Sequence, residues 1–177
     1  MNQVPVTASY RMFLLPTALS VVSGILSGLL FSFEDFEGIN NSGIIRMLLP
    51  GLFFGLTIPF GYRTLLFHQA WRIILYVAIS IGAFYLAVQA YLYAGGILSG
   101  FIGSFILTIS LPLIFNLPWK QRFTTMIIPV LVGAAAGWLF FVVGDWLNSD
   151  YFIAPFVLWQ VLVSLAISWL LQFMART

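Results

Sequence analysis

Few side chains in this sequence could carry acid–base chemistry or hold a metal ion. The chain has no cysteine and one histidine, His68, which stands between Arg63 and Arg72. The five carboxylates fall in two separate segments, residues 34–37 and 145–150. A nucleophilic triad needs a histidine oriented by an acid, and a zinc site needs three or four clustered ligands. We therefore expect neither an enzyme nor a bound metal or cofactor.

Uncharged polar and aromatic side chains within apolar stretches are better candidates for a binding site. Gln89, Ser99 and Gln160 are each surrounded by apolar segments, and Trp138 and Trp159 stand at a similar expected depth. Amides, hydroxyls and indoles of this kind can hold a small neutral or amphipathic solute. The same groups also make hydrogen bonds between membrane helices, worth about 0.6 kcal/mol each. The sequence leaves both roles open.

Arg46 is the cation whose surroundings point most directly to a role in binding, and it joins these five residues as a candidate for contact with substrate. It stands near the start of an apolar stretch that follows the acidic segment 34–37. An arginine there can extend to lipid headgroups, meet an anionic solute, or form a bidentate pair with a carboxylate. Asp145 is the preferred carboxylate, on the assumption that the two helices concerned are neighbours.

Pairs of glycines four residues apart form the clearest pattern in the chain. This spacing puts both glycines on one face of a helix, where a neighbouring helix can approach closely. We expect such contacts at Gly24 and Gly28, Gly51 and Gly55, Gly96 and Gly100 (with Gly103 beyond them), and Gly133 and Gly137. The same faces could instead dock another membrane protein or a second copy of the chain.

Long apolar helices must position all of these residues. Hydrophobic residues make up 62% of the 177-residue chain and charged residues 7%, against about 25% charged in a soluble domain. A chain of this length cannot hide so much apolar surface, so a soluble protein and a nucleic-acid binder are excluded. Stretches of about 20 mostly apolar residues can cross a bilayer. They lie near residues 12–33, 44–62, 71–93, 95–115, 125–146 and 153–174. The sequence thus predicts an all-α, six-span bundle that forms one integral-membrane domain over residues 1–177.

The distribution of Lys and Arg predicts the orientation of this bundle. With a cytoplasmic N-terminus, Arg46 alone lies outside, and the inner segments hold Arg11, Arg63, Arg72, Lys120, Arg122 and Arg176. Cytoplasmic loops are enriched in these two residue types. We therefore expect both termini in the cytoplasm, in a multi-pass protein of the plasma or inner membrane whose main partner is the lipid bilayer.

Short segments recur in the two halves of the chain. Gly-Ile-Leu-Ser-Gly occurs at 24–28 and at 96–100, and Pro50 and Pro129 interrupt the second and fifth spans. Two halves of three spans each would form an inverted repeat, an arrangement found in transporters. The two glycine segments begin at different depths in their spans, however. A repeat and a coincidence within an apolar sequence therefore both remain open.

Two classes of function fit these observations. Six spans, inner termini and an acidic outer loop resemble, in architecture, the substrate-binding subunits of energy-coupling-factor vitamin importers, although serine and glycine replace the alanines of that family's first span. The leading expectation is a small-solute transporter or its membrane subunit, without an intramembrane acid for ion coupling. The alternative is a non-transporting scaffold or assembly subunit. A transporter should contain a polar cavity at the depth of Ser99 and Gln160, whereas a scaffold should be filled and expose small residues.

Overall fold

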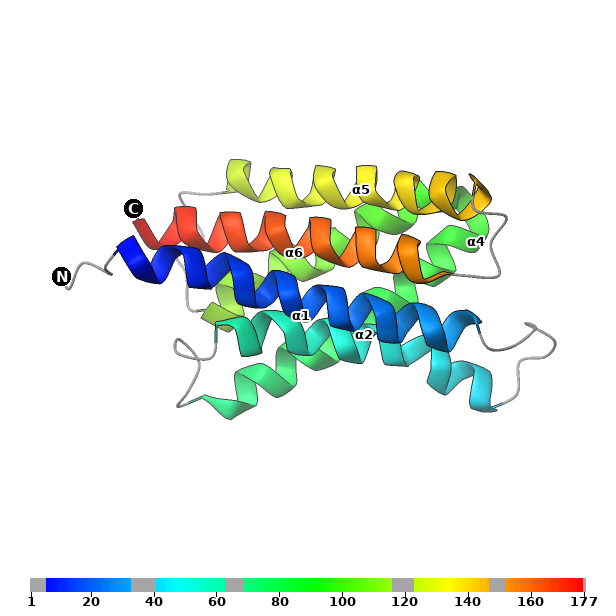
Figure 1. Ribbon diagram of the computed structural model, residues 1–177, viewed down its shortest axis with the longest axis horizontal. Coiled ribbons are helices and arrows are strands. Elements are labelled where there is room, and N and C mark those ends of the chain that lie inside the picture. Colours follow the sequence, from blue (N-terminus) through cyan, green and yellow to red (C-terminus); the bar gives the residue numbers. More distant parts are fainter. Residues whose placement is uncertain (1–5, 33–40, 63–68, 116–122, 147–151, 177) are drawn as a thin grey trace.

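The protein is all-helical in the part of the chain that the structure describes. This computed structural model describes residues 6–32, 41–62, 69–115, 123–146 and 152–176. The helices in these ranges are α1 (Val6–Ser32), α2 (Asn41–Gly61), α4 (Ala70–Phe115), α5 (Phe123–Trp146) and α6 (Ile153–Arg176). The prediction of an all-α fold is therefore confirmed (Figure 1).

Four of these helices are long and apolar enough to cross a membrane. They are α1, α4, α5 and α6, while the apolar part of α2 described here, Leu48–Gly61, is shorter. The count differs from the six expected spans in part because the stretches 71–93 and 95–115 both belong to α4. The helices therefore form a membrane-type all-α fold by length and composition, and each helix satisfies its backbone polar groups internally.

Gly95 divides α4 into two arms. It has a positive φ of 79° and a non-helical ψ of −176°, a conformation that glycine adopts without the steric cost of a side chain. Arg72 Nη1 donates to the carbonyl oxygen of Ile114 at 3.0 Å. In a straight helix these residues would lie about 60 Å apart. The arms therefore fold back on each other as a hairpin, and Figure 1 shows the two ends of α4 at the same end of the bundle.

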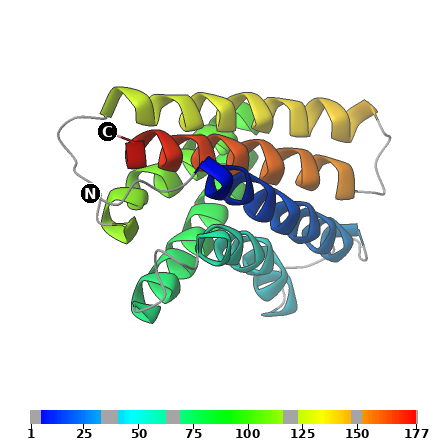
Figure 2. The ribbon, with the colours of Figure 1, turned by 60° about the vertical axis from the view of Figure 1, so that its left-hand side comes forward.

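The remaining packing follows the order of the chain. α1 packs on α2, α2 on α4, α4 on α5 and α5 on α6, and α6 closes the arrangement against α1. Figure 2 shows α5 and α2 on opposite sides, with α6 and α1 between them. The first turn of α1 and the last turn of α6 lie at one end of the bundle (Figure 1).

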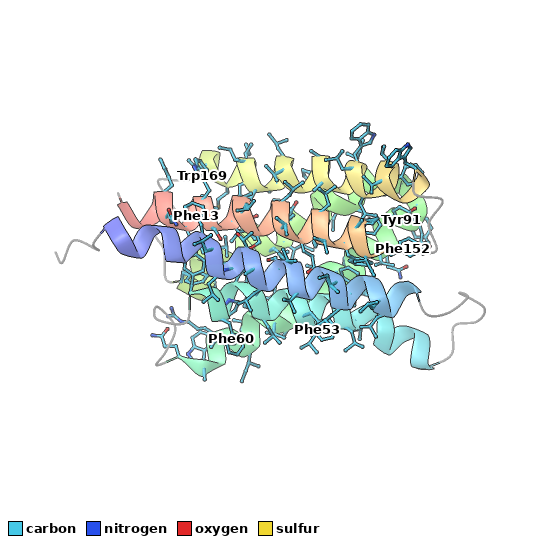
Figure 3. The ribbon with its side chains drawn as sticks, in the orientation of Figure 1. Phe13, Phe53, Phe60, Tyr91, Phe152 and Trp169 are labelled. Atoms are coloured by element: carbon cyan, nitrogen blue, oxygen red, sulfur yellow. The ribbon has the colours of Figure 1, made fainter. Side chains whose placement is uncertain are left out.

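Large apolar side chains cover the outer surface. Tyr93 is 88% exposed, Trp146 82%, Ile74 70% and Leu14 69%. Soluble monomers rarely expose so many large apolar side chains, whereas lipid accepts them. Figure 3 shows Phe13, Phe60 and Trp169 toward the end that holds both termini, and Tyr91 and Phe152 toward the other. Tyr62 lies near the end of a span, where a tyrosine at the membrane interface would be expected. It is buried instead, and its hydroxyl donates to the carbonyl of Ser168 at 3.3 Å.

Candidate functional site

The first close helix contact joins α1 to α6. A Cβ placed on Gly24 would lie 2.5 Å from the Cα of Val157, and one on Gly28 would collide with the Cα of Ile153. Real Cβ atoms essentially never come closer than 3.0 Å to such atoms. Each glycine therefore lies directly against the backbone of α6, so that α1 and α6 behave as one closely packed pair.

Two further pairs are built in the same way. Gly51 and Gly55 of α2 lie against the first arm of α4, where Cβ atoms would meet Ile81 Cα at 2.7 Å and Ser80 Cβ at 2.9 Å. In the second arm, Cβ atoms on the glycine pair would collide with backbone carbonyls of α5. The residues in contact there are Gly96 and Gly100 on α4 and Gly133 and Gly137 on α5. All eight glycines singled out by their spacing thus contact a neighbouring helix.

These contacts bear on the sequence repeat. In an inverted repeat α1 would correspond to the second arm of α4, and α6 to the first arm. Gly24 and Gly28 face α6, so Gly96 and Gly100 would have to face the first arm of α4. They face α5 instead. The two Gly-Ile-Leu-Ser-Gly segments are therefore not structurally equivalent.

The three glycine-packed pairs meet around a small central cavity. Its walls come from α2, both arms of α4, and α6, and they comprise Gly51, Phe54, Ser80, Ala83, Phe84, Gly103, Leu107 and Trp159. The cavity volume is about 10 Å³, which is close to the smallest space that can hold one water molecule. Phe54 and Trp159 face each other across α2 and α6, with ring centroids 5.5 Å apart. Among the described residues, this cavity therefore has no room for a solute larger than about one water molecule.

A polar seam runs between α1 and α6, beside this cavity. Gln160 Nε2 donates to the Ser27 hydroxyl at 3.0 Å, and that hydroxyl donates to the Ser23 carbonyl at 2.7 Å. Three further buried atoms have no hydrogen-bond partner in the structure: Gln160 Oε1, Ser23 Oγ and Ser164 Oγ. An unpaired buried polar group costs about 1–3 kcal/mol. The polar seam is therefore an energetically expensive feature of an otherwise apolar bundle.

The candidate binding residues do not form one cluster. Trp159 lines the central cavity, and Gln160 is fully buried in the polar seam. Trp138 is 51% exposed on the outer surface of α5. Gln89 and Ser99 are half-buried on the two arms of α4 near the Gly95 turn, and neither lines the cavity. Gln89, Ser99 and Trp138 therefore do not join Trp159 around this cavity.

The side chains of Arg46 and Asp145 lie outside the described residues, so their pairing is not seen. Their helices can be compared, because both residues belong to helical backbone. Figures 1 and 2 show the start of α2 and the end of α5 on opposite sides of the bundle. α5 packs mainly on α4 and α6. The assumption that α2 and α5 are close neighbours is therefore not supported.

Several residues of the cavity had not been singled out as binding residues. Ser80 is one of many uncharged polar residues in apolar stretches, and Gly103 merely follows a glycine pair. Phe54 and Phe84 are two of 18 phenylalanines, so composition offers no signal for them. Membrane helices are apolar on all sides, and which face points inward is set by the neighbouring helices.

Comparison with known proteins assigns no family to the chain, and the described residues offer no metal site. No protein-family model, curated protein or solved structure matches the chain. The architectural likeness to vitamin-importer subunits therefore has no independent support. Among the described residues, no three His, Asp or Glu side chains gather in a way that could hold a metal ion.

Proposed function

We propose that the chain is a small-solute transporter, or the membrane subunit of one. In this proposal six segments cross the plasma or inner membrane and both termini are cytoplasmic. The two arms of α4 count as separate spans, and α2 completes the set. Two observations are compatible with this topology. The chain turns at Gly95, and the start of α1 lies at the same end of the bundle as the end of α6.

The buried, unpaired polar atoms carry the proposal. On α6, Gln160, Ser164 and Ser168 follow one another at intervals of four and are all fully buried. Each keeps an atom without a partner in the structure. In lipid such groups have no water to turn to, so they destabilise the closed bundle. A conformation in which they meet water or a solute would offset that cost.

The absence of charge in this interior limits the class of solute. The buried polar residues of the described helices are hydroxyl and amide side chains, and none is ionised at neutral pH. Burying an ion without a countercharge costs far more than burying a neutral polar group. The solute is therefore uncharged. Because the central cavity has room for no more than about one water molecule, transport in this proposal requires the helices to separate.

Uptake into proteoliposomes tests the proposal. The purified protein is reconstituted, and uptake of radiolabelled nicotinamide, glycerol and urea is compared with that of protein-free liposomes. We expect uptake of at least one of these solutes above the protein-free background, and a reduced rate in Gln160→Leu. Uptake equal to the background for all three would reject transport of small neutral solutes.

A scaffold or assembly subunit is the second candidate, and a different observation favours it. The central cavity is only about 10 Å³, and Ala78 and Gly82 form an exposed small-residue face on the first arm of α4. A Cβ on Gly82 would meet nothing within 4 Å. Such a face admits the close approach of another membrane helix.

Crosslinking in native membranes tests the scaffold candidate. A photoreactive amino acid at Ala78 should give one adduct of defined mass, and Gly82→Leu should abolish it. The same amino acid at Leu14, which is 69% exposed on α1, is the control. Identical adducts from both positions would indicate random collisions in the bilayer.

A further inference from the structure

Gly103 differs from the other glycines at helix contacts in the described bundle. A Cβ placed there would lie 3.4 Å from Ala87 Cβ, 3.5 Å from Trp159 Cζ2 and 4.0 Å from the Ala83 carbonyl. These are ordinary van der Waals distances, whereas Cβ atoms on Gly24, Gly51 or Gly100 would come within 3.0 Å of a neighbouring helix. Close packing therefore requires glycine at those positions but not at Gly103.

An alanine at Gly103 would be favoured by local energetics. Glycine within a helix is less stable than alanine because it loses more backbone freedom on folding. The additional methyl group would also fill part of the central cavity, which improves packing. Gly103 has no positive φ that would require glycine. The absent methyl group leaves space at the point where three closely packed helix pairs meet.

The walls around that space define what could occupy it. Phe54, Phe84 and Trp159 supply aromatic surfaces, and Ser80 is the lining residue that carries a side-chain hydroxyl. No charged side chain lines the cavity. Apolar walls with one polar group are typical of sites for small molecules, in which a few polar atoms set the orientation.

We propose that the central cavity, kept open by Gly103 against Trp159, is the closed form of a binding site for a small uncharged solute with an aromatic or apolar body and one hydrogen-bonding group. This inference rests on the proposed transport function and names its class of substrate. The site enlarges when the glycine-packed helix pairs separate from each other. The contacts across the cavity are side-chain contacts, and they separate more readily than backbone contacts at glycine.

Cysteine labelling tests whether the cavity opens, without requiring knowledge of the substrate. The chain has no native cysteine, so Gly103→Cys introduces a single thiol. In proteoliposomes, uncharged N-ethylmaleimide should label it about tenfold faster than Ala136→Cys, as for an opening that costs roughly 1.4 kcal/mol less than exposure of a packed core residue. Ala136 lies on α5 and is completely buried, with 0% of its surface exposed. A cationic trimethylammonium thiosulfonate should react poorly at both.

A filling variant tests whether the space is used. Gly103→Ala should raise the Tm in detergent and lower nicotinamide uptake by about tenfold, the effect of losing roughly 1.4 kcal/mol of interaction. Gly82→Ala is the matched control: it changes glycine to alanine in the same helix, at an exposed position with no neighbouring atom within 4 Å. It should raise the Tm without changing uptake. Labelling of Gly103→Cys no faster than Ala136→Cys, or normal uptake by Gly103→Ala, would overturn the inference.

The two proposals fail in different ways. If no solute is taken up but Gly103→Cys reacts quickly and nicotinamide slows the reaction, transport is rejected and the binding site stands. If solutes are taken up while Gly103→Cys stays unreactive, transport stands and the cavity is only a packing defect.

Discussion

The side-chain amide of Gln160 donates to the hydroxyl of Ser27 at 3.0 Å and so links the last helix to the first. The two residues are 133 positions apart in the chain. The same two helices are in contact at Gly24 with Val157 and at Gly28 with Ile153. A polar bond and a glycine contact thus act together to hold α1 against α6.

A double-mutant cycle measures this bond. Gln160→Leu and Ser27→Ala are combined, and the free energy of unfolding is followed in mixed detergent micelles. We expect a coupling of about 0.6 kcal/mol, and not more than about 1.7 kcal/mol, the range of hydrogen bonds between membrane helices. Ser20→Ala is the control, because the Ser20 hydroxyl bonds to the Pro16 carbonyl of its own helix. Equal coupling of Gln160 to Ser20 would show that the effect is not specific.

Arg72 should stabilise the α4 hairpin. Its guanidinium donates to Ile114 at the end of the second arm and lies 5.3 Å from the centre of the Trp71 ring. Arg72→Ala should lower the free energy of unfolding by about 1.5 kcal/mol, the lower end for a hydrogen bond from a charged donor. Arg72→Lys should restore part of it. Thermal unfolding in detergent distinguishes the variants, and the same Tm for Ala, Lys and Arg would remove the stabilising role.

Gly100 should not tolerate a large side chain. Its Cβ position collides with the carbonyl of Gly133, so Gly100→Leu must push α5 away from α4. We expect a loss of about 1–3 kcal/mol, as in other overpacked interiors. Gly82→Leu adds the same side chain to an exposed position and should change stability by no more than about 0.5 kcal/mol. Similar Tm values for the two variants would contradict packing through glycine.

Single cysteines can establish the orientation in the membrane. Cysteines at Glu37 and Ser149 should react with an impermeant thiol reagent in intact cells, because the distribution of Lys and Arg predicts that both segments lie outside. Cysteines at His68 and Gln121 should react only after permeabilisation. Reaction of the His68 variant from outside would reverse the orientation.

Arg46 and Asp145 should be energetically independent. Arg46 lies near the start of α2 and Asp145 near the end of α5, and these two helix ends are on opposite sides of the bundle (Figures 1 and 2). α5 packs on α4 and α6 and not closely on α2, and charges more than about 8 Å apart are largely screened at physiological salt. A cycle of Arg46→Ala and Asp145→Ala should therefore give a coupling indistinguishable from zero. A significant coupling would mean that the two helices approach each other in another conformation.

The sequence predicts the fold of this chain better than the site. Gly95 and Gly96 interrupt an apolar stretch too long for one span, and this local signal is enough to predict the hairpin. The spacing of Gly100 and Gly133 likewise identifies residues that meet other helices. Both features depend on the backbone. Glycine directly marks the positions where the backbone turns or where two helices come close together.

Side-chain orientation could not be inferred in the same way. Trp138 and Trp159 have similar apolar neighbours in the sequence, yet one faces outward and the other lines the cavity. In a soluble helix, polar residues would mark the outer face, but lipid favours apolar side chains on all sides. The inward face of α6 is set by its contacts with α1, α5 and α2. Those contacts join distant parts of the chain.

The turn at Gly95 also has a consequence for biosynthesis. The two arms of α4 follow each other within 46 residues, with only Gly95 departing from helical geometry. No hydrophilic loop separates the two arms. Polar residues therefore cannot hold one arm at the membrane surface while the other arm inserts. We therefore expect the two arms to enter the bilayer together, as one helical hairpin whose backbone hydrogen bonds are satisfied within the helices.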